Sequence, residues 1–313
     1  MRYKTIGIAL CKKCNAECSM CCISATPKSE EKLELCLVKK YLDDVENIES
    51  ISTIGITGGE VFLFYDELKE LILYIREKGK FATVVTNGFW ATDYIHTFSR
   101  LQDLKQCGLN GITISYDTFH EEYVSVEKVR NILQVSKILK IPAVIQTIII
   151  KGSCNQRWIN ELSDDLQDVK ISFTGCYQVG RAKERIKQES IIRNTEVGGL
   201  YCRKNGEYSV TSDGSIWPCC SPYITETALK LGSISDEINV SKTLKKIRKN
   251  MILFMLRNYG FDFFIDIAEK ELHMELPDKV ASSCELCALL FREETIHLFI
   301  PYIHKFLRRE KHF

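Results

Sequence analysis

The 313-residue sequence has no run of about 18 uncharged apolar residues, the length that a helix needs to cross a bilayer, so no membrane span is expected. Its first apolar run, residues 6–10, is short and is followed by Lys12 and Lys13, so no signal peptide is expected either. Neither sign of charge is in excess, because 42 Lys and Arg stand against 41 Asp and Glu. This balance argues against a protein built to hold nucleic acid or an anionic membrane. A cytoplasmic protein is therefore expected.

No internal repeat and no low-complexity linker interrupts the chain, and its 45% hydrophobic and 27% charged residues are typical of a globular protein. The 14 cysteines fall well under the roughly 8–10% share that marks a small disulfide scaffold. A chain of this length can also bury a sizeable core without disulfides. In a reducing compartment, grouped cysteines indicate metal ligands or catalytic thiols.

The cysteines form two groups and a scattered remainder. One group, near the start of the chain, comprises Cys11, Cys14, Cys18, Cys21 and Cys22. The other, after residue 200, comprises Cys202, Cys219, Cys220, Cys284 and Cys287. The scattered cysteines, which are expected to be small buried hydrophobic residues, are Cys36, Cys107, Cys154 and Cys176.

Up to about residue 175, short β-rich runs alternate with amphipathic stretches. Strands are predicted over residues 3–10, 51–57, 81–86, 111–116, 143–150 and 169–173. Helices are predicted over residues 30–49, 66–79, 92–107, 125–140 and 156–167. Within them, a helix face that covers a sheet is indicated by the spacing of Leu68, Leu71, Ile72 and Ile75. The alternation implies right-handed βαβ units and a parallel sheet. Six such units are fewer than the eight of a closed barrel, so an open, partial barrel is expected.

After about residue 195 the pattern changes. Glycines separate short polar strands here. One of them belongs to the turn pair Asp213-Gly214, which indicates a hairpin. Residues 236–275 are predicted to be helical, with an apolar run at 251–256 that packs in the core. The expected fold class is α/β: a partial barrel over residues 1–195, and a second region over residues 196–313 packed on the first.

The first cysteine motif, Cys14-x-x-x-Cys18-x-x-Cys21, follows the first predicted strand directly. It therefore lies on a loop at the carboxyl end of a strand, where α/β barrels place their chemistry. Three thiolates on one short loop can ligate three irons of a [4Fe–4S] cluster and leave the fourth iron open. The alternative is a zinc site, which takes four protein ligands, or three and a water.

This motif resembles that of the radical SAM superfamily, in which the open iron binds the amino and carboxylate groups of S-adenosylmethionine (SAM). Electron transfer from the cluster then yields a 5′-deoxyadenosyl radical. A second motif, Gly58-Gly59-Glu60, ends the second predicted strand, and the resemblance assigns it to the amino group of the methionine moiety. The resemblance places further residues around cofactor and substrate, namely Met20, Asn87, Ser115, Asp117, Gln146 and Arg181. For two of these residues a purely structural role is the alternative: a turn at Asn87, and a solvent-exposed helix start at Arg181. Val61 and Met20 stand where the superfamily has a proline and an aromatic residue.

Four later cysteines, Cys202, Cys219, Cys284 and Cys287, are enough to hold a second, closed cluster. Their order resembles the auxiliary-cluster extensions, called SPASM or twitch, of radical SAM enzymes that modify peptides. In those extensions a glycine-bearing hairpin leads to a Pro-Cys pair, as in Pro218-Cys219 here. The resemblance implies an auxiliary [4Fe–4S] cluster on these four thiols. A structural zinc site is the alternative.

Cys220 is left over. Because successive side chains of an extended chain point apart, it is not expected to share a metal with Cys219. Two interpretations stay open: a buried structural cysteine, or a thiol that donates a hydrogen atom in the cavity.

Nearly the whole chain resembles the YydG-type epipeptide epimerases, radical SAM isomerases that convert L-residues of a ribosomally made peptide to D-residues. The resemblance rests on TGGEVFL (57–63), NGFW (87–90), ITISYD (112–117), VGRAKERIKQ (179–188), CCSP (219–222) and SSCELC (282–287). It implies that the 5′-deoxyadenosyl radical removes a Cα hydrogen and that Cys220 returns one from the opposite face. The hairpin of that family has an aspartate near the hydrogen-donating cysteine. Glu207 stands at the matching position here, as an acid near Cys220. A purely structural hairpin acid is the alternative.

The resemblance implies two partners, a ribosomally synthesised precursor peptide and an electron donor of the flavodoxin or ferredoxin type. It also implies that the auxiliary cluster, or Cys22, helps to re-reduce the thiyl left on Cys220. The alternative is that Cys11 and Cys22 are inert neighbours of the first cluster and take no part in the reduction. Two other functions are considered: a radical SAM maturase that forms thioether or carbon–carbon crosslinks, and a non-catalytic zinc or iron–sulfur protein.

Overall fold

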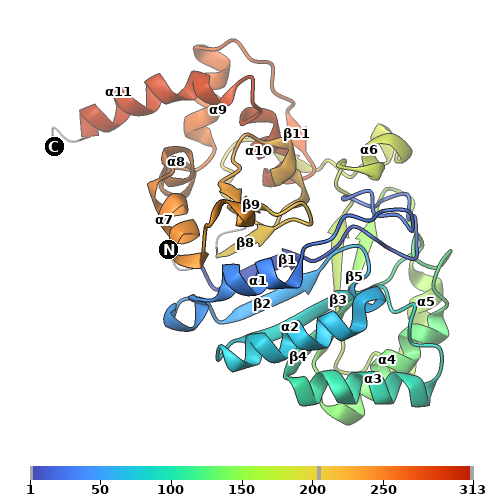
Figure 1. Ribbon diagram of the computed structural model, residues 1–313. Coiled ribbons are helices and arrows are strands. Elements are labelled where there is room, and N and C mark those ends of the chain that lie inside the picture. Colours follow the sequence, from blue (N-terminus) through green and yellow to red (C-terminus); the bar gives the residue numbers. More distant parts are fainter. Residues whose placement is uncertain (1–2, 203–205, 311–313) are drawn as a thin grey trace.

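The computed structural model describes residues 3–202 and 206–310 (Figure 1). The strands of its main sheet are β1 (Thr5–Ala9), β2 (Thr53–Thr57), β3 (Phe81–Thr86), β4 (Leu109–Ser115), β5 (Ala143–Ile149), β6 (Lys170–Gly175), β8 (Glu207–Val210), β9 (Ser215–Trp217) and β10 (Gly232–Ser233). Two short strands, β7 (Thr195–Glu196) and β11 (Lys279–Val280), pair separately. The order of the main sheet is β10-β9-β8-β1-β2-β3-β4-β5-β6, so β10 and β6 are its edges and the sheet is open.

The six strands predicted before residue 175 are confirmed, and β1 to β6 run parallel to one another. The helices are α1 (Leu35–Leu42), α2 (Tyr65–Glu77), α3 (Tyr94–Cys107), α4 (Val126–Leu139), α5 (Gln156–Glu161), α6 (Arg181–Arg185), α7 (Val240–Lys249), α8 (Met251–Tyr259), α9 (Asp262–Lys270), α10 (Ser283–Leu290) and α11 (Ile300–Glu310). Helices α1 to α4 follow one another along one face of the sheet (Figure 1). The predicted apolar face of α2 is fully buried there. The fold is therefore α/β with an open parallel sheet.

One predicted helix is much shorter than expected. Residues 30–49 are predicted to be helical, but α1 spans only Leu35–Leu42. The preceding segment is held extended because Lys12 N–H donates to Glu31 O and Leu33 N–H donates to Leu10 O. These bonds tie residues 31–33 to the chain that follows β1.

The two faces of the strands carry different side chains. On β1, Ile6 and Ile8 are buried on the helix-covered face, whereas Gly7 and Ala9 point to the other face. The same alternation recurs along β2 and β8, where isoleucine, tyrosine and valine face the core. Small residues on the opposite face leave room there for a cavity.

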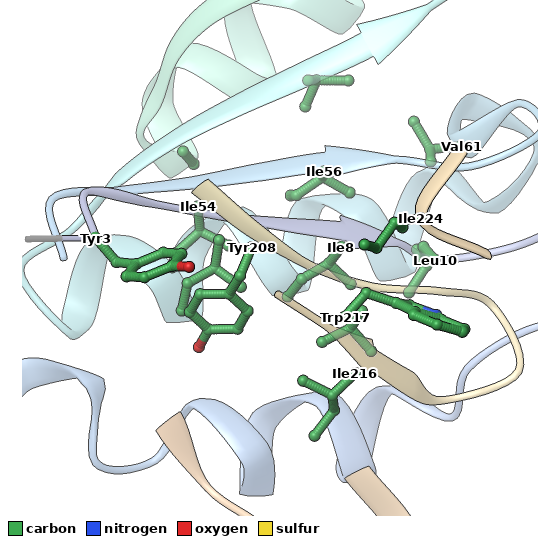
Figure 2. Close-up of a cluster of buried hydrophobic side chains, with 14 of the residues drawn as sticks. Tyr3, Ile8, Leu10, Ile54, Ile56, Val61, Tyr208, Ile216, Trp217 and Ile224 are labelled. Carbon is green, nitrogen blue, oxygen red and sulfur yellow. The ribbon is translucent and has the colours of Figure 1, made fainter. Parts of the chain in front are cut away.

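The hairpin predicted near residue 213 is confirmed, and it extends the main sheet. Strand β8 pairs in parallel with β1, with Thr5 beside Glu207, and β9 returns antiparallel to β8. Figure 2 shows Tyr208, Ile216 and Trp217 of the hairpin packed against the side chains of β1. Tyr41 O–H donates to Tyr208 Oη over 2.9 Å. Because sheet and core run across residue 195, the division into residues 1–195 and 196–313 stays a prediction about folding units.

The single helix predicted over residues 236–275 is wrong, since three helices, α7, α8 and α9, occupy this stretch. Asn250 has an extended backbone, and its side chain accepts from Leu253 N–H, so it ends α7 and caps α8. Gly260, with a φ of 73°, ends α8. The apolar run at 251–256 is nevertheless mostly buried, as predicted. None of the helices in the described part of the chain is long and apolar enough to cross a membrane.

Three of the four scattered cysteines are not buried, contrary to expectation. Cys36 and Cys154 are exposed, Cys107 is half-buried, and only Cys176 is buried. Cys36 lies on the outer surface of the short α1, and Cys154 lies in the turn after β5.

Candidate active site

A cavity of about 350 Å³ lies on the face of the sheet that the small strand residues leave open. It brings together many of the site residues predicted from the sequence, namely Cys14, Cys18, Met20, Cys21, Gly58, Gly59, Asn87, Ser115, Gln146 and Cys220. The other predicted residues lie outside its lining: Glu60, Asp117, Arg181, Glu207, Cys202, Cys219, Cys284 and Cys287. Most of the predicted cofactor residues therefore share one space.

The cysteine loop after β1 is clamped by the glycine pair that ends β2. Gly59 N–H donates to Cys11 O over 2.7 Å, and Glu60 N–H donates to Lys13 O over 2.8 Å. A Cβ atom on Gly59 would lie 2.1 Å from Lys13 O, and one on Gly58 would lie 2.6 Å from Cys11 O. These two positions therefore require glycine, because the loop backbone passes directly over them.

The thiols of the loop lie near one another; Cys14 and Cys18 are buried, and Cys21 is half-buried. Burial raises the pKa of Cys14 to about 12, and the nearby Cys21 thiol adds to the shift. Burial, with the thiols of Cys14 and Cys21, likewise raises the pKa of Cys18 to about 12. Backbone N–H groups point at two of the sulfurs, from Ala16 to Cys14 at 3.4 Å and from Ala25 to Cys21 at 3.3 Å. Such donors stabilise thiolates that bind iron.

This donor set fits a [4Fe–4S] cluster with one open iron. Within residues 3–202 and 206–310, no three His, Cys, Asp or Glu side chains lie close enough together to hold a single metal ion. The cysteine ligands of a cluster bind different irons, so they need not converge on one point. Asn87 Nδ2 also lies 3.7 Å from Cys14 Sγ, within reach of the same group.

Glu60 of the Gly-Gly-Glu motif is fully buried and joins the ends of two strands. Its carboxylate accepts from Thr86 Oγ1 at 2.9 Å, from Asn87 N–H at 2.7 Å and from Phe62 N–H at 3.0 Å. Burial raises its pKa to about 7, against the lowering effect of these bonds. In this structure Glu60 holds the ends of β2 and β3 in register.

Asp117 is also fully buried, and a neighbouring histidine faces the cavity instead. The Asp117 carboxylate accepts from Phe119 N–H and Ile148 N–H, and His120 Nδ1 lies 2.9 Å from its Oδ1. His120 lines the cavity, whereas Asp117 does not. Sequence analysis missed His120; the signal that could have found it is a histidine three residues after an aspartate that ends a strand.

Arg181 holds the cysteine loop through hydrogen bonds to its backbone carbonyl groups. Its guanidinium donates to Cys18 O over 3.0 Å and to Ala25 O over 2.5 Å. Its backbone N–H donates to Cys21 O over 2.9 Å. The preceding Gly180 has a φ of 60°, and a Cβ atom there would lie 2.4 Å from Cys22 O. The sequence after β6 therefore contacts the later part of the loop, whereas Gly59 contacts its start.

The second cysteine group gathers four thiols from three segments. Burial raises the pKa of Cys219 well above its usual range, and the thiols of Cys284 and Cys202 add to this. The pKa of Cys287 is raised by burial and by Cys219, Cys202 and Cys284. These four cysteines, called here the thiol tetrad, form a donor set that fits a closed cluster.

A partly buried ion pair supports the helix that carries half of the thiol tetrad. Glu285 lies between Cys284 and Cys287 on α10, and its Oε1 accepts from Arg193 Nη2 over 2.8 Å. Its Oε2 accepts from Ala281 N–H over 2.6 Å. Arg193 belongs to the segment between α6 and β7, so the pair ties the end of the barrel to α10.

Cys220 turns away from the thiol tetrad and lines the cavity, although Cys219 next to it does not. The Cys220 thiol donates a hydrogen bond to Glu207 Oε2 over 2.7 Å. Glu207 and Ser209 lie on the cavity face of β8, level with Thr5 and Gly7 of β1. The Cys220 thiol and the loop of Cys14, Cys18 and Cys21 thus line one cavity, and Glu207 bonds to that thiol from outside the lining. Other lining residues that sequence analysis missed are Thr86, Tyr177, Ser209 and Thr225.

Comparison with known proteins agrees with this arrangement. The family model for the radical SAM superfamily matches residues 8–150. YydG of Bacillus subtilis (strain 168), a protein named for peptide biosynthesis, is 34% identical over 316 residues, which cover 98% of this chain and 98% of that protein. A protein of Archaeoglobus fulgidus named for GTP 3′,8-cyclase activity is 25% identical over 185 residues, 57% of each chain.

Among solved structures, BtrN in complex with AdoMet and 2-DOIA superposes with a TM-score of 0.52. The match covers 82% of this chain and 88% of BtrN at 15% identity, and so shows a likeness of fold. Together with the near full-length match to YydG, the open parallel sheet and the clamped cysteine loop lead to one conclusion. The chain belongs to the radical SAM superfamily, whose members use a [4Fe–4S] cluster and S-adenosylmethionine.

Proposed function

We propose that this protein is a radical SAM peptide epimerase, an isomerase that converts L-residues of a ribosomally synthesised peptide to D-residues. The observation that carries the proposal is that Cys220 lines the same cavity as Cys14, Cys18 and Cys21. The 34% identity to YydG, a protein named for peptide biosynthesis, supports a peptide as the substrate.

The cavity's own residues would hold the cofactors. Cys14, Cys18 and Cys21 would ligate the cluster, and Gly58, Gly59 and Asn87 lie beside the loop where S-adenosylmethionine would bind. When bound, cluster and SAM supply a 5′-deoxyadenosyl radical that removes a hydrogen atom from carbon. Ser115, Gln146 and Met20 face the same space. The thiol tetrad of Cys202, Cys219, Cys284 and Cys287 would hold the auxiliary [4Fe–4S] cluster.

Inversion at Cα requires that the hydrogen leaves from one side and returns from the other. The loop of Cys14 follows the end of β1, whereas Glu207, the partner of Cys220, is level with Thr5 at its start. At about 3.3 Å per residue, these two ends of β1 are roughly 13 Å apart. A peptide Cα held between them would be approached from two sides.

The return step is a hydrogen-atom transfer. The S–H bond of Cys220 breaks, a C–H bond forms at the planar Cα radical, and a thiyl radical stays on Cys220. One electron from a reduced flavodoxin or ferredoxin, with one proton, restores the thiol. Glu207 is placed to hand over that proton, because its Oε2 accepts from the Cys220 thiol and its side chain is exposed.

The lining also suits a carbon radical and an aliphatic target residue. Ala9, Ala16, Ile23, Ile148 and Ile224 make much of the wall apolar, which limits access of water and of stray hydrogen donors. The resemblance to the epipeptide epimerases suggests valine or isoleucine as the target residue, and the apolar lining is compatible with either. The proposed substrate is a nascent precursor peptide, and the proposed electron donor is a flavodoxin or ferredoxin. We therefore expect the reaction to occur in the cytoplasm.

The test is turnover in D₂O with a peptide that the wild-type enzyme modifies, selected from synthetic peptides with a central valine or isoleucine. Because a thiol exchanges with solvent, each epimerised residue should gain one deuterium at Cα. Cys220→Ala should still cleave SAM but form no D-residue, whereas the exposed Cys36→Ala should behave like wild type. A D-residue without deuterium, or full activity of Cys220→Ala, would overturn the assignment of Cys220. A product lighter by two hydrogens would instead identify a crosslinking maturase.

Metal analysis of anaerobically purified protein tests the cofactor set. Two [4Fe–4S] clusters predict about eight irons per chain. Replacing Cys14, Cys18 and Cys21 together should leave about four, and so should replacing the thiol tetrad. Zinc in place of iron would contradict the radical mechanism altogether.

A further inference from the structure

Strand β6 forms an open edge of the main sheet along its whole length. In the described part of the chain its only strand neighbour is β5, and six consecutive residue pairs join the two, from Val144 beside Lys170 to Ile149 beside Gly175. None of the six residues of β6 is buried, whereas each of the strands β1 to β5 contains buried residues. The strand at the other edge, β10, has only two residues. The sheet therefore has one edge that is long enough to pair with another chain.

Half of the peptide groups of β6 point outward from the sheet. Along a strand, the backbone N–H and C=O groups of alternate residues point to one neighbour, and those of the residues between them point to the other side. Cys176 directly follows β6, and its N–H donates to Ile149 O over 3.0 Å, so the even-numbered residues of β6 face β5. Ile171, Phe173 and Gly175 therefore present their N–H and C=O groups at the open edge. Among the described residues, no strand pairs with these groups and no other hydrogen bond reaches them.

The side chains of β6 do not protect this edge. Proteins usually guard an exposed edge strand with charged side chains, a proline or a β-bulge. After Lys170 the strand reads Ile-Ser-Phe-Thr-Gly, with no charge and no proline, and its register with β5 is regular. Phe173 is 52% exposed, and a Cβ atom on Gly175 would meet nothing within 4 Å. The edge is therefore accessible to an extended chain.

The edge also leads to the cavity that Cys220 lines. Tyr177 lies two residues after the end of β6 and lines this cavity. Ile148 of β5 lines it as well, and Thr174 of β6 is paired with Ile148 in the sheet. A strand added to β6 would lie two strand spacings from β5, or roughly 10 Å. An extended peptide crosses that distance with about three residues. The paired segment of such a peptide and a residue inside the cavity would thus be near neighbours in its sequence.

We propose that the precursor peptide docks on β6 as an additional strand, and that the chain beyond this strand enters the cavity beside Tyr177. Main-chain hydrogen bonds to Ile171, Phe173 and Gly175 supply the affinity, as in other cases of strand addition. The docking segment must be extended and free of proline at the residues that donate to β6. Continuity of the edge with the cavity favours the peptide over a second copy of this chain, because the peptide has a residue to place beside Cys220. The inference rests on the proposed function for the peptide nature of the substrate.

The test measures binding to the anaerobic holoenzyme. The probe is a fluorophore-labelled form of the valine- or isoleucine-centred synthetic peptide that the wild-type enzyme modifies. Phe173→Pro removes one outward N–H and leaves the bonds to β5 in place, so its Tm should stay within about 4 °C of wild type. Phe173→Ala removes the ring but keeps the N–H. Phe81→Ala is the matched control for the ring, because Phe81 is 58% exposed at the start of β3.

We expect Phe173→Pro to raise the peptide Kd at least about tenfold. Phe173→Ala should raise it less than about fivefold, and Phe81→Ala should stay within about twofold of wild type. Modified peptides give a second test, in which the enzyme is unchanged. Because alternate residues of a paired peptide face β6, N-methylation of two alternate residues in the segment next to the target should raise the Kd at least about tenfold. N-methylation of the two residues of the other alternate set should leave the Kd within about twofold.

An unchanged Kd for Phe173→Pro, or equal effects of the two N-methylated sets, would overturn the proposal. A wild-type dimer that Phe173→Pro converts to a monomer in sedimentation, with an unchanged peptide Kd, would assign the edge to a second copy and overturn it as well. The proposed function fails separately, because docking is measured by the Kd alone. A crosslinked product would refute the epimerase and not the strand addition. D-residues formed by Phe173→Pro with an unchanged Kd would refute the strand addition and not the epimerase.

Discussion

His120 Nδ1 lies 2.9 Å from Oδ1 of Asp117, and both side chains are almost completely buried at the end of β4. The bond fixes the plane of the imidazole and leaves Nε2 as its other polar atom. The carboxylate does more than orient the ring, since it also accepts backbone N–H groups from Phe119, after β4, and from Ile148 on the neighbouring β5.

This difference in partners predicts unequal costs of substitution. Asp117→Asn places an amide N–H₂ among N–H donors and should lower the free energy of unfolding by roughly 3 kcal/mol. His120→Phe removes one bond and should cost about 1 kcal/mol. Urea unfolding of both variants under anaerobic conditions measures the two values. A larger loss for His120→Phe than for Asp117→Asn would show that the carboxylate is not the centre of this network.

The clamp on the cysteine loop predicts a sharp contrast between two glycines. Gly59→Ala forces a methyl group against Lys13 O and should cost about 3 kcal/mol, because the contact is with backbone on both sides. It should also halve the iron content of the reconstituted protein, to about four per chain. Gly198→Ala is the control: a Cβ atom there meets nothing within 4 Å, and its cost should stay below about 0.5 kcal/mol. Full iron loading of Gly59→Ala would contradict the clamp.

Glu60 predicts a pH dependence of stability. Its pKa rises from 4.5 to about 7 on folding, chiefly through burial. Between these values the folded state binds a proton that the unfolded state does not, so stability falls as the pH rises from 4.5 to 7. Relative to Glu60→Gln, the iron-free wild type should lose roughly 3 kcal/mol of unfolding free energy across this window. Parallel pH profiles for the two proteins would show that Glu60 keeps an ordinary pKa.

The partly buried pair of Arg193 and Glu285 predicts a coupled loss of stability and metal. Arg193→Met leaves the Glu285 carboxylate buried without its partner and should cost about 3 kcal/mol. Because Glu285 lies between Cys284 and Cys287, iron should be lost from the tetrad before the first cluster. The surface pair of Arg157 and Glu161 serves as the control, since Arg157→Met should cost less than about 0.5 kcal/mol. Unfolding curves and iron analysis on the same samples would separate the two effects. Equal costs for the two arginines would show that burial of the pair adds nothing.

Local sequence patterns predicted the parallel strands and the two cysteine groups because they depend on neighbours in the chain. The spacing of Cys14, Cys18 and Cys21 and the glycines at 58 and 59 needed no tertiary information. The division of residues 236–275 into three helices also had a local signal, in Asn250 and Gly260, but the apolar run between them dominated the pattern.

Features that depend on distant segments could not be predicted in this way. The pairing of β8 with β1, the burial of Glu60 between two strand ends and the position of His120 in front of Asp117 all follow from packing. The family resemblance likewise implied an acid near Cys220 at Glu207, but only tertiary structure brings their side chains to 2.7 Å.

The pairing of Thr5 with Glu207 also constrains how this protein is made. Strand β1 leaves the ribosome about two hundred residues before β8, its neighbour in the finished sheet. Translation adds roughly 5–20 residues per second, so one edge of β1 stays unpaired for roughly 10–40 s until β8 is made. During that interval Ile6 and Ile8 lie next to an unpaired strand edge, which is the kind of surface that chaperones shield and that aggregates form on. The cavity can therefore be completed only after Thr225 is made, so loading of the SAM-binding [4Fe–4S] cluster is expected to follow synthesis of that segment.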